Sequence, residues 1–452
     1  MISKKIKNIT PVKIHNPKTV DLYSPWDLKK IAKIECINKD NVDQILDVSN
    51  NAFLNREKFL SKIERIKILK KSKNLLLKNS KKFAEIIAFE GGKPLKDSKI
   101  EVARAINGIE LCVEVLKKSH GTEIPMNLNS ASSNKIAFTR KFPIGTVLAI
   151  SAFNHPLNLI IHQVCPAVAA GCPIIIKPAL DTPATCYEFI KLLMEAGLPK
   201  EFCQMINIDN HAITHKLVSD PRISFFSFIG SAKVGWKLKS MLSPGTKCAM
   251  EHGGVGSVII DKGTNLKKIL PSILKGAFYH AGQVCVSIQK VIIHKDLVDQ
   301  FTSMLRDSVK KVKIGDPRDI NTDVGPLIRP SEVTRVDKVV KRAIKDGAEL
   351  ICGGAIKSKT TYECTVLKDP KETSEISKCE IFGPVLSIYS YSLIDDAISM
   401  ANHKEYSFQS SIYTKNIDVA MLCFERLEAK SVFVNEQTAF RVDWMPFAGI
   451  KH

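Results

Sequence analysis

The hydrophobic and polar positions along the chain predict a helical N-terminal region and then two regions in which strands and helices alternate. Between residues 41 and 119, apolar positions such as Phe83 and Ile87 recur at steps of three and four, as in helices with one buried face. The break at Gly91-Gly92-Lys93-Pro94 interrupts this spacing before Asp97 opens another helix. Residues 120–142 combine turn residues with short apolar alternation, which predicts a hairpin projecting from the body.

From residue 145 the pattern changes to short apolar runs separated by amphipathic segments. It predicts strands over 146–150, 173–176, 202–208 and 224–229, with helices over 157–170 and 183–196. A second alternating region follows Glu251, with strands over 257–260, 291–293, 385–391, 410–413 and 431–434 and helices near 265–280, 296–312 and 332–346. Such alternation with short connections predicts parallel sheets covered by helices on both faces, which bind ligands at the carboxyl ends of their strands.

Length and composition are those of a globular protein with at least two domains. The chain has 452 residues, of which 44% are hydrophobic and 25% charged. No apolar run is long enough to span a bilayer, and the basic start lacks the apolar core of a secretion signal. The twelve cysteines are scattered, without a Cys-x-x-Cys pair or zinc spacing. We therefore expect a cytoplasmic protein with reduced thiols and no metal site.

The formal net charge of +20 raises the alternative of a nucleic-acid-binding protein. The lysines are spread thinly over predicted helix faces, and Lys70-Lys71 and Lys310-Lys311 are among the densest clusters. This distribution favours a solvated surface over a nucleic-acid site. The charge would still attract anionic substrates.

A cysteine and a carboxylate form the most specific chemical pattern. Cys285 follows Gly282-Gln283-Val284, and Glu251 precedes His252-Gly253-Gly254. A thiol attacks carbonyl carbon as the thiolate, so it needs a lowered pKa or a nearby base, and a carboxylate in a cleft can accept that proton or one from water. The alternative is that Cys285 is a small buried hydrophobe, as most single cysteines are.

Three further segments end predicted strands of the first sheet. Gly230 to Gly235 lies where a strand passes into a helix, and could receive a pyrophosphate or be a plain turn. Lys177 could hydrogen-bond ribose hydroxyls or be solvated. The side-chain amide of Asn154, together with the backbone N–H of a cysteine, would form an oxyanion hole.

Together these motifs resemble the NAD(P)-dependent aldehyde dehydrogenases over nearly the whole chain, nearest in detail to lactaldehyde, non-phosphorylating glyceraldehyde-3-phosphate and phosphonoacetaldehyde dehydrogenases. The motifs that carry the resemblance, in the family's order and spacing, are Phe142-Pro143-Ile144-Gly145, Phe153-Asn154-His155-Pro156-Leu157, Lys177-Pro178, Phe228-Ile229-Gly230-Ser231, Glu251-His252-Gly253-Gly254, Gly282-Gln283-Val284-Cys285, Glu380-Ile381-Phe382-Gly383-Pro384 and Met445-Pro446-Phe447-Ala448-Gly449.

The resemblance implies a mechanism of covalent catalysis. Cys285 would attack the aldehyde to give a thiohemiacetal, whose oxyanion Asn154 and the Cys285 amide would hold. Hydride transfer to the nicotinamide would leave a thioester, and Glu251 would activate the water that hydrolyses it. Lys177 and Glu380 would bind the two riboses of the cofactor, Gly230-Ser231 its pyrophosphate, and Phe382 would pack near the nicotinamide ribose.

The resemblance also implies an α/β architecture of two Rossmann-like parallel-sheet domains with a small oligomerisation hairpin. Residues 1–119 and 143–251 would form the NAD(P)-binding domain and 252–440 the catalytic domain. Residues 120–142 would form the hairpin, and 441–452 the start of a C-terminal segment. The family suggests a homodimer or homotetramer.

The chain departs from the family pattern at several positions. Leu180 replaces the glutamate that binds the adenosine ribose in many members, so both NAD and NADP are possible cofactors. His252, Ile229 and Ala448 stand where leucine, threonine and glycine are usual. The family continues beyond Lys451-His452, so we expect a truncated chain with an unpaired sheet edge and an exposed apolar face.

For the substrate we expect a small hydroxylated or anionic aldehyde, such as lactaldehyde or a glyceraldehyde-3-phosphate-like aldehyde. Arg104, His155 and Arg441 match positions at which some relatives contact an anionic tail, and arginine suits such groups. The alternative is that Arg104 pairs with Glu101 and Arg441 with Asp443. Two rival functions are a CoA-acylating semialdehyde dehydrogenase, which Glu251 disfavours, and a truncated inactive scaffold, which the presence of all three catalytic residues disfavours.

Overall fold

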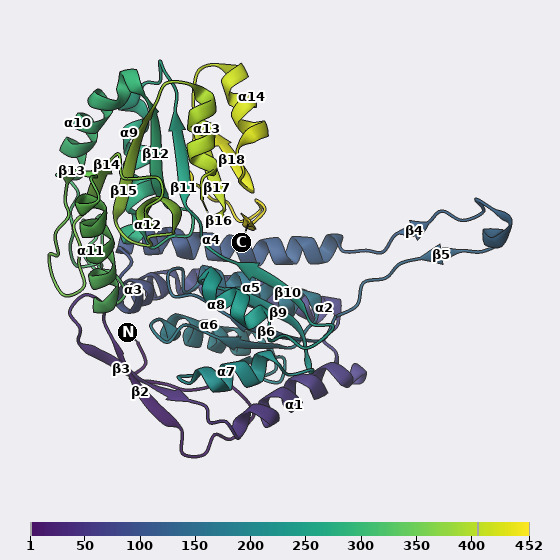
Figure 1. Cartoon of the computed structure of the whole chain (residues 1–452). Coiled ribbons are helices and arrows are strands. Elements are labelled where there is room, and N and C mark those ends of the chain that lie inside the picture. Colours follow the sequence, from purple (N-terminus) through teal and green to yellow (C-terminus); the bar gives the residue numbers. More distant parts are fainter. Residues whose placement is uncertain (1, 405, 452) are drawn as a thin grey trace.

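Two sheets form the body of the molecule in the computed structural model (Figure 1). The structure describes residues 2–404 and 406–451. Met1 and His452, at the ends of the predicted segments 1–119 and 441–452, lie outside the described residues. Both sheets are essentially parallel, and α4 (Leu95–Lys118) runs between them in Figure 1. The predicted α/β fold class is therefore confirmed.

The first sheet has five parallel strands in the order β10-β9-β6-β7-β8. Its strands are β6 (Thr146–Ile150), β7 (Ile174–Lys177), β8 (Cys203–Met205), β9 (Ile223–Ile229) and β10 (Lys247–Glu251). Successive side chains of a strand point to opposite faces. Val147 and Ala149 accordingly enter the core under one face, while Leu148 and Ile150 enter the core under the other. Both faces are buried, which explains why β6 is an uninterrupted apolar run.

Helices cover both faces of this sheet. Beside α4, they are α1 (Asn41–Leu54), α2 (Lys62–Lys78), α3 (Ser80–Gly91), α5 (Asn158–Ala170), α6 (Pro183–Ala196), α7 (His211–Val218), α8 (Ala232–Lys239) and the short 3-10 helix η1 (Arg56–Lys58). The core that contains Val147 is shared with α2 to α6, and the core that contains Leu148 is shared with α1 and α7. The predicted helical region 41–119 is thus four helices, and α6 has its predicted bounds.

The second sheet has seven strands in the order β13-β14-β15-β12-β11-β17-β18, and only β13 is antiparallel to its neighbour. The strands are β11 (Gly256–Ile260), β12 (Ile288–His294), β13 (Glu349–Cys352), β14 (Thr365–Lys368), β15 (Val385–Tyr391), β17 (Gln409–Tyr413) and β18 (Ser431–Val434). Its helices are α9 (Leu266–Phe278), α10 (Val298–Val309), α11 (Pro330–Lys345), α12 (Glu375–Lys378), α13 (Ile394–Asn402) and α14 (Ile417–Arg426), with the 3-10 turns η3 (Tyr279–Gly282) and η4 (Lys295–Leu297). The β15 and β18 bounds are those predicted.

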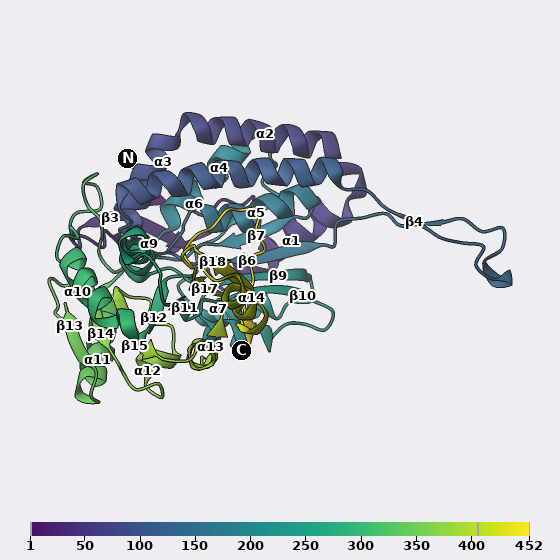
Figure 2. The same cartoon turned by 90° about the horizontal axis from the view of Figure 1, so that it is seen from above.

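The hairpin 120–142 is a long arm that leaves the body beyond α4 (Figures 1 and 2). It holds the short antiparallel strands β4 (Glu123–Ile124) and β5 (Ala137–Phe138) and the turn η2 (Ser130–Ser132). Its apolar side chains face outward: Leu128 is 79%, Ile136 86% and Phe138 74% exposed. A monomer leaves this surface without a partner.

Some elements had no sequence signal. A three-stranded sheet of β1 (Lys5–Ile6), β2 (Lys18–Tyr23) and β3 (Lys30–Cys36) packs beside the first sheet, and β16 (Tyr406–Ser407) pairs with β19 (Ile450–Lys451). The strand predicted over 202–208 ends at Met205. Beyond Met205 the backbone bonds to the N-terminal segment. The Asn207 N–H donates to Asn8 Oδ1, and the Asn207 carbonyl accepts from the Ile37 N–H.

Candidate active site

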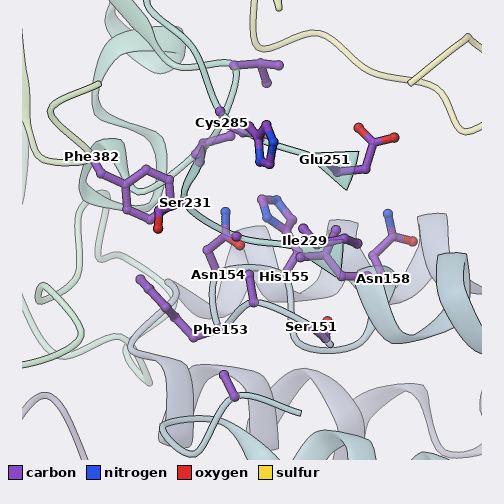
Figure 3. Close-up of a pocket in the computed structure, with 18 of the residues that line it drawn as sticks. Ser151, Phe153, Asn154, His155, Asn158, Ile229, Ser231, Glu251, Cys285 and Phe382 are labelled. Carbon is purple, nitrogen blue, oxygen red and sulfur yellow. The ribbon is translucent and has the colours of Figure 1, made fainter. Parts of the chain in front are cut away.

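A cavity of about 550 Å³ lies between the two sheets and is lined by residues of both (Figure 3). Its walls come from the carboxyl ends of β6, β9 and β10 on one side and from the segment between α9 and β12 on the other. Parallel strands place their carboxyl ends at one edge, so residues far apart in the sequence meet there. Cys285, Glu251 and Asn154 all line this cavity.

The loop that carries Cys285 has an unusual backbone. His280 (φ 49°), Ala281 (φ 55°) and Gly282 (φ 70°) are consecutive residues in the left-handed region. A side chain on Gly282 would place its Cβ 2.0 Å from the carbonyl oxygen of Gly383, so only glycine fits at this position. Left-handed alanine and histidine cost energy, and such strain is found where the surrounding structure fixes a functional loop. The strained turn delivers the partly exposed Cys285 to the cavity wall.

The surroundings of Cys285 favour the protonated thiol over the thiolate. Burial, together with the carboxyl groups of Glu380 and Glu251, raises its pKa to about 12, and the Arg441 guanidinium acts in the opposite direction. A nucleophilic thiolate therefore needs a proton acceptor or an added positive charge in the cavity.

Glu251 is the last residue of β10. The register of β10 with β9 places it opposite Ile229, next to the Gly230-Ser231 turn. Its Oε2 is buried without a hydrogen-bond partner, and burial raises the pKa of Glu251 to about 8, with Arg441 opposing. An unpartnered carboxyl group with such a pKa is suited to take and release protons near neutral pH.

Asn154 lies in the connection between β6 and α5 and is buried. Its Nδ2 donates to the backbone carbonyl of Gln283 over 2.9 Å, which ties it to the loop of Cys285. A side-chain amide has two N–H groups, so the second remains available to an oxygen in the cavity. Next to it, His155 contacts Tyr279 through Nε2 and the phenol hydroxyl at 3.4 Å, and burial lowers the pKa of His155, which keeps the ring neutral.

The residues predicted for the cofactor line the same cavity, except one. Ser231 precedes α8 with its hydroxyl uncommitted to that helix, and the Phe382 ring meets Phe153 edge-to-face with centroids 5.8 Å apart. Lys177 does not line the cavity. Its Nζ lies 3.4 Å from the Pro178 carbonyl at the end of β7.

The carboxyl group of Glu380 lies against Gly253 in a position that fits a ligand. The Oε1 atom of Glu380 is buried without a partner, and a Cβ on Gly253 would lie only 1.8 Å from it. Gly253 therefore makes room for the carboxyl group. An orphaned acceptor in a cleft beside the Gly230-Ser231 turn fits a ligand with hydroxyl groups, such as the ribose of a dinucleotide.

The substrate-side arginines differ in their partners. Arg104 donates from Nε (3.1 Å) and Nη2 (2.7 Å) to the two carboxylate oxygens of Asp443. The alternative pairing of Arg104 with Glu101, and of Arg441 with Asp443, is wrong, because Arg104 forms the ion pair with Asp443. Arg441 donates to the Met445 and Pro446 carbonyls over 3.0 and 2.7 Å. Its guanidinium lies over the Phe447 ring, and its Nε is buried without a hydrogen-bond partner.

Two polar residues of this region had no role in the sequence-based prediction. His162 Nε2 lies 2.9 Å and Asn158 Nδ2 3.2 Å from Asp443 Oδ1. Although burial acts in the opposite direction, the hydrogen bonds from His162 and Arg104 hold the pKa of Asp443 below its usual value. The sequence signal was available, since Asn158 and His162 are four residues apart and share one face of α5.

Comparison with known proteins identifies the family. A sequence model of the Aldehyde dehydrogenase family matches residues 12–452. The chain belongs to this family, and it is an oxidoreductase that uses NAD or NADP.

Three similar proteins show how far the likeness extends. The chain is 34% identical to the 3-sulfolactaldehyde dehydrogenase of Priestia aryabhattai, over 96% of this chain and 90% of that protein. It is 33% identical to the lactaldehyde dehydrogenase of Methanococcus vannielii, over 96% and 92%. The crystal structure of the glyceraldehyde-3-phosphate dehydrogenase GapN from Methanocaldococcus jannaschii, complexed with NADP, superposes with a TM-score of 0.91 at 31% identity, covering 97% of this chain and 94% of that one.

The structure also bears on membranes and metals. None of the helices within residues 2–404 and 406–451 combines the length and apolarity needed to cross a membrane. Over the same residues, no cluster of three or more histidine, cysteine, aspartate or glutamate side chains is arranged to hold a metal ion.

Proposed function

We propose that this protein oxidises a small anionic or hydroxylated aldehyde to the carboxylic acid through a thioester on Cys285. The observation that carries the proposal is the convergence of Cys285, Asn154 and Glu251, from three distant segments, on one cavity. When bound, NAD(P)+ supplies the hydride acceptor and a positively charged ring. Glu380, Ser231 and Gly230 would hold it in the cleft, with Phe382 against the nicotinamide ribose and Lys177 on the adenosine ribose.

In the first half of the reaction, the Cys285 Sγ forms a bond to the aldehyde carbon, and the carbonyl oxygen becomes an oxyanion. The free N–H of the Asn154 amide and the backbone N–H of Cys285 donate to that oxygen. The thiol proton leaves to Glu251 or to water. Loss of hydride from the same carbon then restores the carbonyl group as a thioester.

In the second half, Glu251 removes a proton from water as the water oxygen attacks the thioester carbon. The C–S bond breaks and releases the acid and the Cys285 thiol. The free Oε2 of Glu251 is what supports water, rather than CoA, as the acceptor of the acyl group. If acyl-CoA formed in proportion to added CoA, the rival reaction would replace this one.

The pH dependence of turnover follows from Glu251. Its pKa is raised to about 8, so its base form is a minority at neutral pH and dominates only above about 8. We expect kcat for the hydrolytic step to rise about tenfold per pH unit below that value and then to level. Steady-state rates from pH 6 to 9 measure this rise of kcat with pH, which Glu251→Gln should abolish. If the rise persists in this variant, the titrating group is not Glu251.

The charges at the substrate end favour a single anionic group. Arg104 is neutralised by Asp443, and His155 is neutral. Among the described residues, Arg441 has no carboxylate at ion-pair distance. One positive charge therefore remains uncompensated in a half-buried site, which suits a carboxylate, sulfonate or phosphate tail. The similarity to dehydrogenases for 3-sulfolactaldehyde and glyceraldehyde-3-phosphate supports this class of substrate.

Arg441→Met tests the anionic tail. We expect kcat/KM for 3-sulfolactaldehyde or succinic semialdehyde to fall about 30- to 100-fold, as for loss of a charge-assisted hydrogen bond. The same variant should lose less than about threefold with propanal, which has no charge to bind. Propanal therefore reports any displacement of the 445–446 backbone that Arg441 also holds. Equal losses on charged and neutral aldehydes would contradict an anion site at Arg441.

We also propose that residues 1–119 with 143–251, and 252–440, are the cofactor-binding and catalytic domains, and that the 120–142 arm binds another copy. The two sheets fall on either side of the proposed division at 251, and the exposed apolar side chains of the arm support the association. Sedimentation of the intact chain as a monomer would contradict the role of the arm.

A further inference from the structure

A buried ion pair outside the cavity contacts both halves of the candidate active site. Lys93 follows the turn between α3 and α4, and Glu101 lies on α4 two turns later. Lys93 Nζ bonds to Glu101 Oε2, and neither side chain has any exposed surface. A fully buried ion pair is seldom retained for stability alone. Its formation removes both charges from water, which costs free energy that a solvent-exposed pair does not lose.

Glu101 holds the segment that carries Asn154. Its second oxygen, Oε1, accepts from the backbone N–H of Leu157 (2.9 Å) and of Asn158 (3.1 Å) at the start of α5. These N–H groups have no partner within the helix, and a negative charge at a helix start is favourable. Asn154, labelled in Figure 3, lies three residues before Leu157. The carboxylate therefore fixes the backbone from which the oxyanion donor projects.

Lys93 faces the segment that carries Cys285. Its Nζ lies 5.9 Å from the centroid of the Tyr279 ring, within the range of a cation–π contact. Tyr279 opens the strained turn that leads to the catalytic cysteine, and its hydroxyl meets His155 at 3.4 Å. The pair thus lies between the connection after β6 and the turn before β12, which belong to different sheets.

The turn at Gly92 links the ion pair to the same two segments by a second route. The Gly92 carbonyl would lie 2.1 Å from a Cβ on Gly325, so the two backbones are in close approach. The next residue, Pro326, accepts from Gln283 Nε2 over 3.2 Å, and the Gln283 backbone carbonyl accepts from Asn154. Displacement of the ion pair would therefore move the oxyanion donor relative to the cysteine.

We propose that the Lys93–Glu101 ion pair is a positioning device for the reaction, which sets the separation between the Cys285 thiol and the Asn154 amide. The proposal rests on the proposed function of those two residues. It assigns Lys93 and Glu101 no contact with substrate or cofactor, because neither lines the cavity.

Glu101→Gln tests the device, since it preserves the shape and an acceptor oxygen but leaves the charge of Lys93 uncompensated. We expect kcat per active site, counted by the burst of NAD(P)H, to fall about 10- to 100-fold, as for a displacement of about 1 Å at the reacting atoms. The KM for the cofactor should stay within about twofold. A purely structural residue would lower the number of active sites and the melting temperature without changing the rate of each site.

A double-mutant cycle asks whether Glu101 acts through Asn154. In an Asn154→Ala background, Glu101→Gln should cost less than about threefold, because the donor that it positions is already gone. Equal losses in both backgrounds, or an unchanged kcat in Glu101→Gln, would overturn the proposal. If Glu101→Gln does not fold, Glu101→Asp carries the same cycle, since it keeps the charge and withdraws the carboxylate by one methylene. Full activity of Asn154→Ala alone would instead refute the oxyanion role in the proposed function.

Glu90→Gln is the matched control. Glu90 is equally buried and accepts from the backbone N–H groups of Ala184 and Thr185 at the start of α6, over 2.7 and 2.8 Å. Its removal should lower the melting temperature as Glu101→Gln does, but α6 carries no reacting group. We expect kcat per active site to stay within about twofold of wild type. A loss equal to that of Glu101→Gln would show that any buried carboxylate at a helix start has this effect and would overturn the proposal.

Discussion

We expect Cys285→Ala to lower kcat by at least about 10⁴-fold, because Cys285 is the only thiol among the described residues that line the cavity. The cavity side of this residue is partly exposed, so alanine removes the thiol without creating a deep void, and the melting temperature should change little. Steady-state formation of NAD(P)H with an aldehyde panel measures the loss.

Cys352→Ala is the control for thiol chemistry in general. Cys352 is also half-buried, but it lies on the edge strand β13, away from the cavity. Its replacement should leave kcat within about twofold. Residual activity of Cys285→Ala near that of wild type would eliminate the covalent mechanism.

Asn154→Ala has the second largest expected effect. Removal of one oxyanion donor costs about 10²- to 10³-fold in kcat, which corresponds to about 2.7–4 kcal/mol. The loss should appear in kcat and not in the KM of the cofactor, because the amide acts on an oxygen that is charged only during the reaction. Single-turnover rates of NAD(P)H formation separate this step from hydrolysis.

Asn158→Ala is the control that separates the role of Asn154 from the general loss of a buried amide in the cavity. Asn158 is another buried amide lining the cavity, but it donates to Asp443 over 3.2 Å and so belongs to the substrate end. We expect it to change the KM of the aldehyde more than kcat. A loss confined to KM in Asn154→Ala as well would mean that Asn154 only binds substrate.

Local patterns in the sequence predicted four of the five strands of the first sheet, but not β10. The segment 183–196 has a clear helical periodicity, and 146–150 is a short uninterrupted apolar run, so local physics is enough to define both. The N-terminal strands β1 to β3 were not predicted. Their residues are only half apolar, and their buried side chains, such as Ile6 and Ile34, pack in a core shared with distant elements, such as Phe189 of α6.

The candidate site was predicted as a set of residues, but their partners were not. The end of the strand predicted over 146–150 identifies where Asn154 lies, because topology brings such ends to one edge. Glu251 was identified by its Glu-His-Gly-Gly motif, and its place at the end of β10 was not predicted. The pairing of Arg104 with Asp443 depends on how the segment after β18 packs against α4, and the two residues are 339 positions apart in the sequence. The contact of Lys93 with Tyr279 likewise exists only after the two sheets have met.

The proposed function depends on a thioester that forms on Cys285 and is hydrolysed with the help of Glu251. Glu251→Gln, mixed with NAD(P)+ and an excess of aldehyde, measures it most directly, with the NAD(P)H burst followed by absorbance and the protein by mass spectrometry. We expect a burst of about one NAD(P)H per active site, followed by slow turnover, and an added acyl mass on the peptide that contains Cys285. Full turnover without a burst, or an unmodified Cys285 in a variant that has released NAD(P)H, would contradict it.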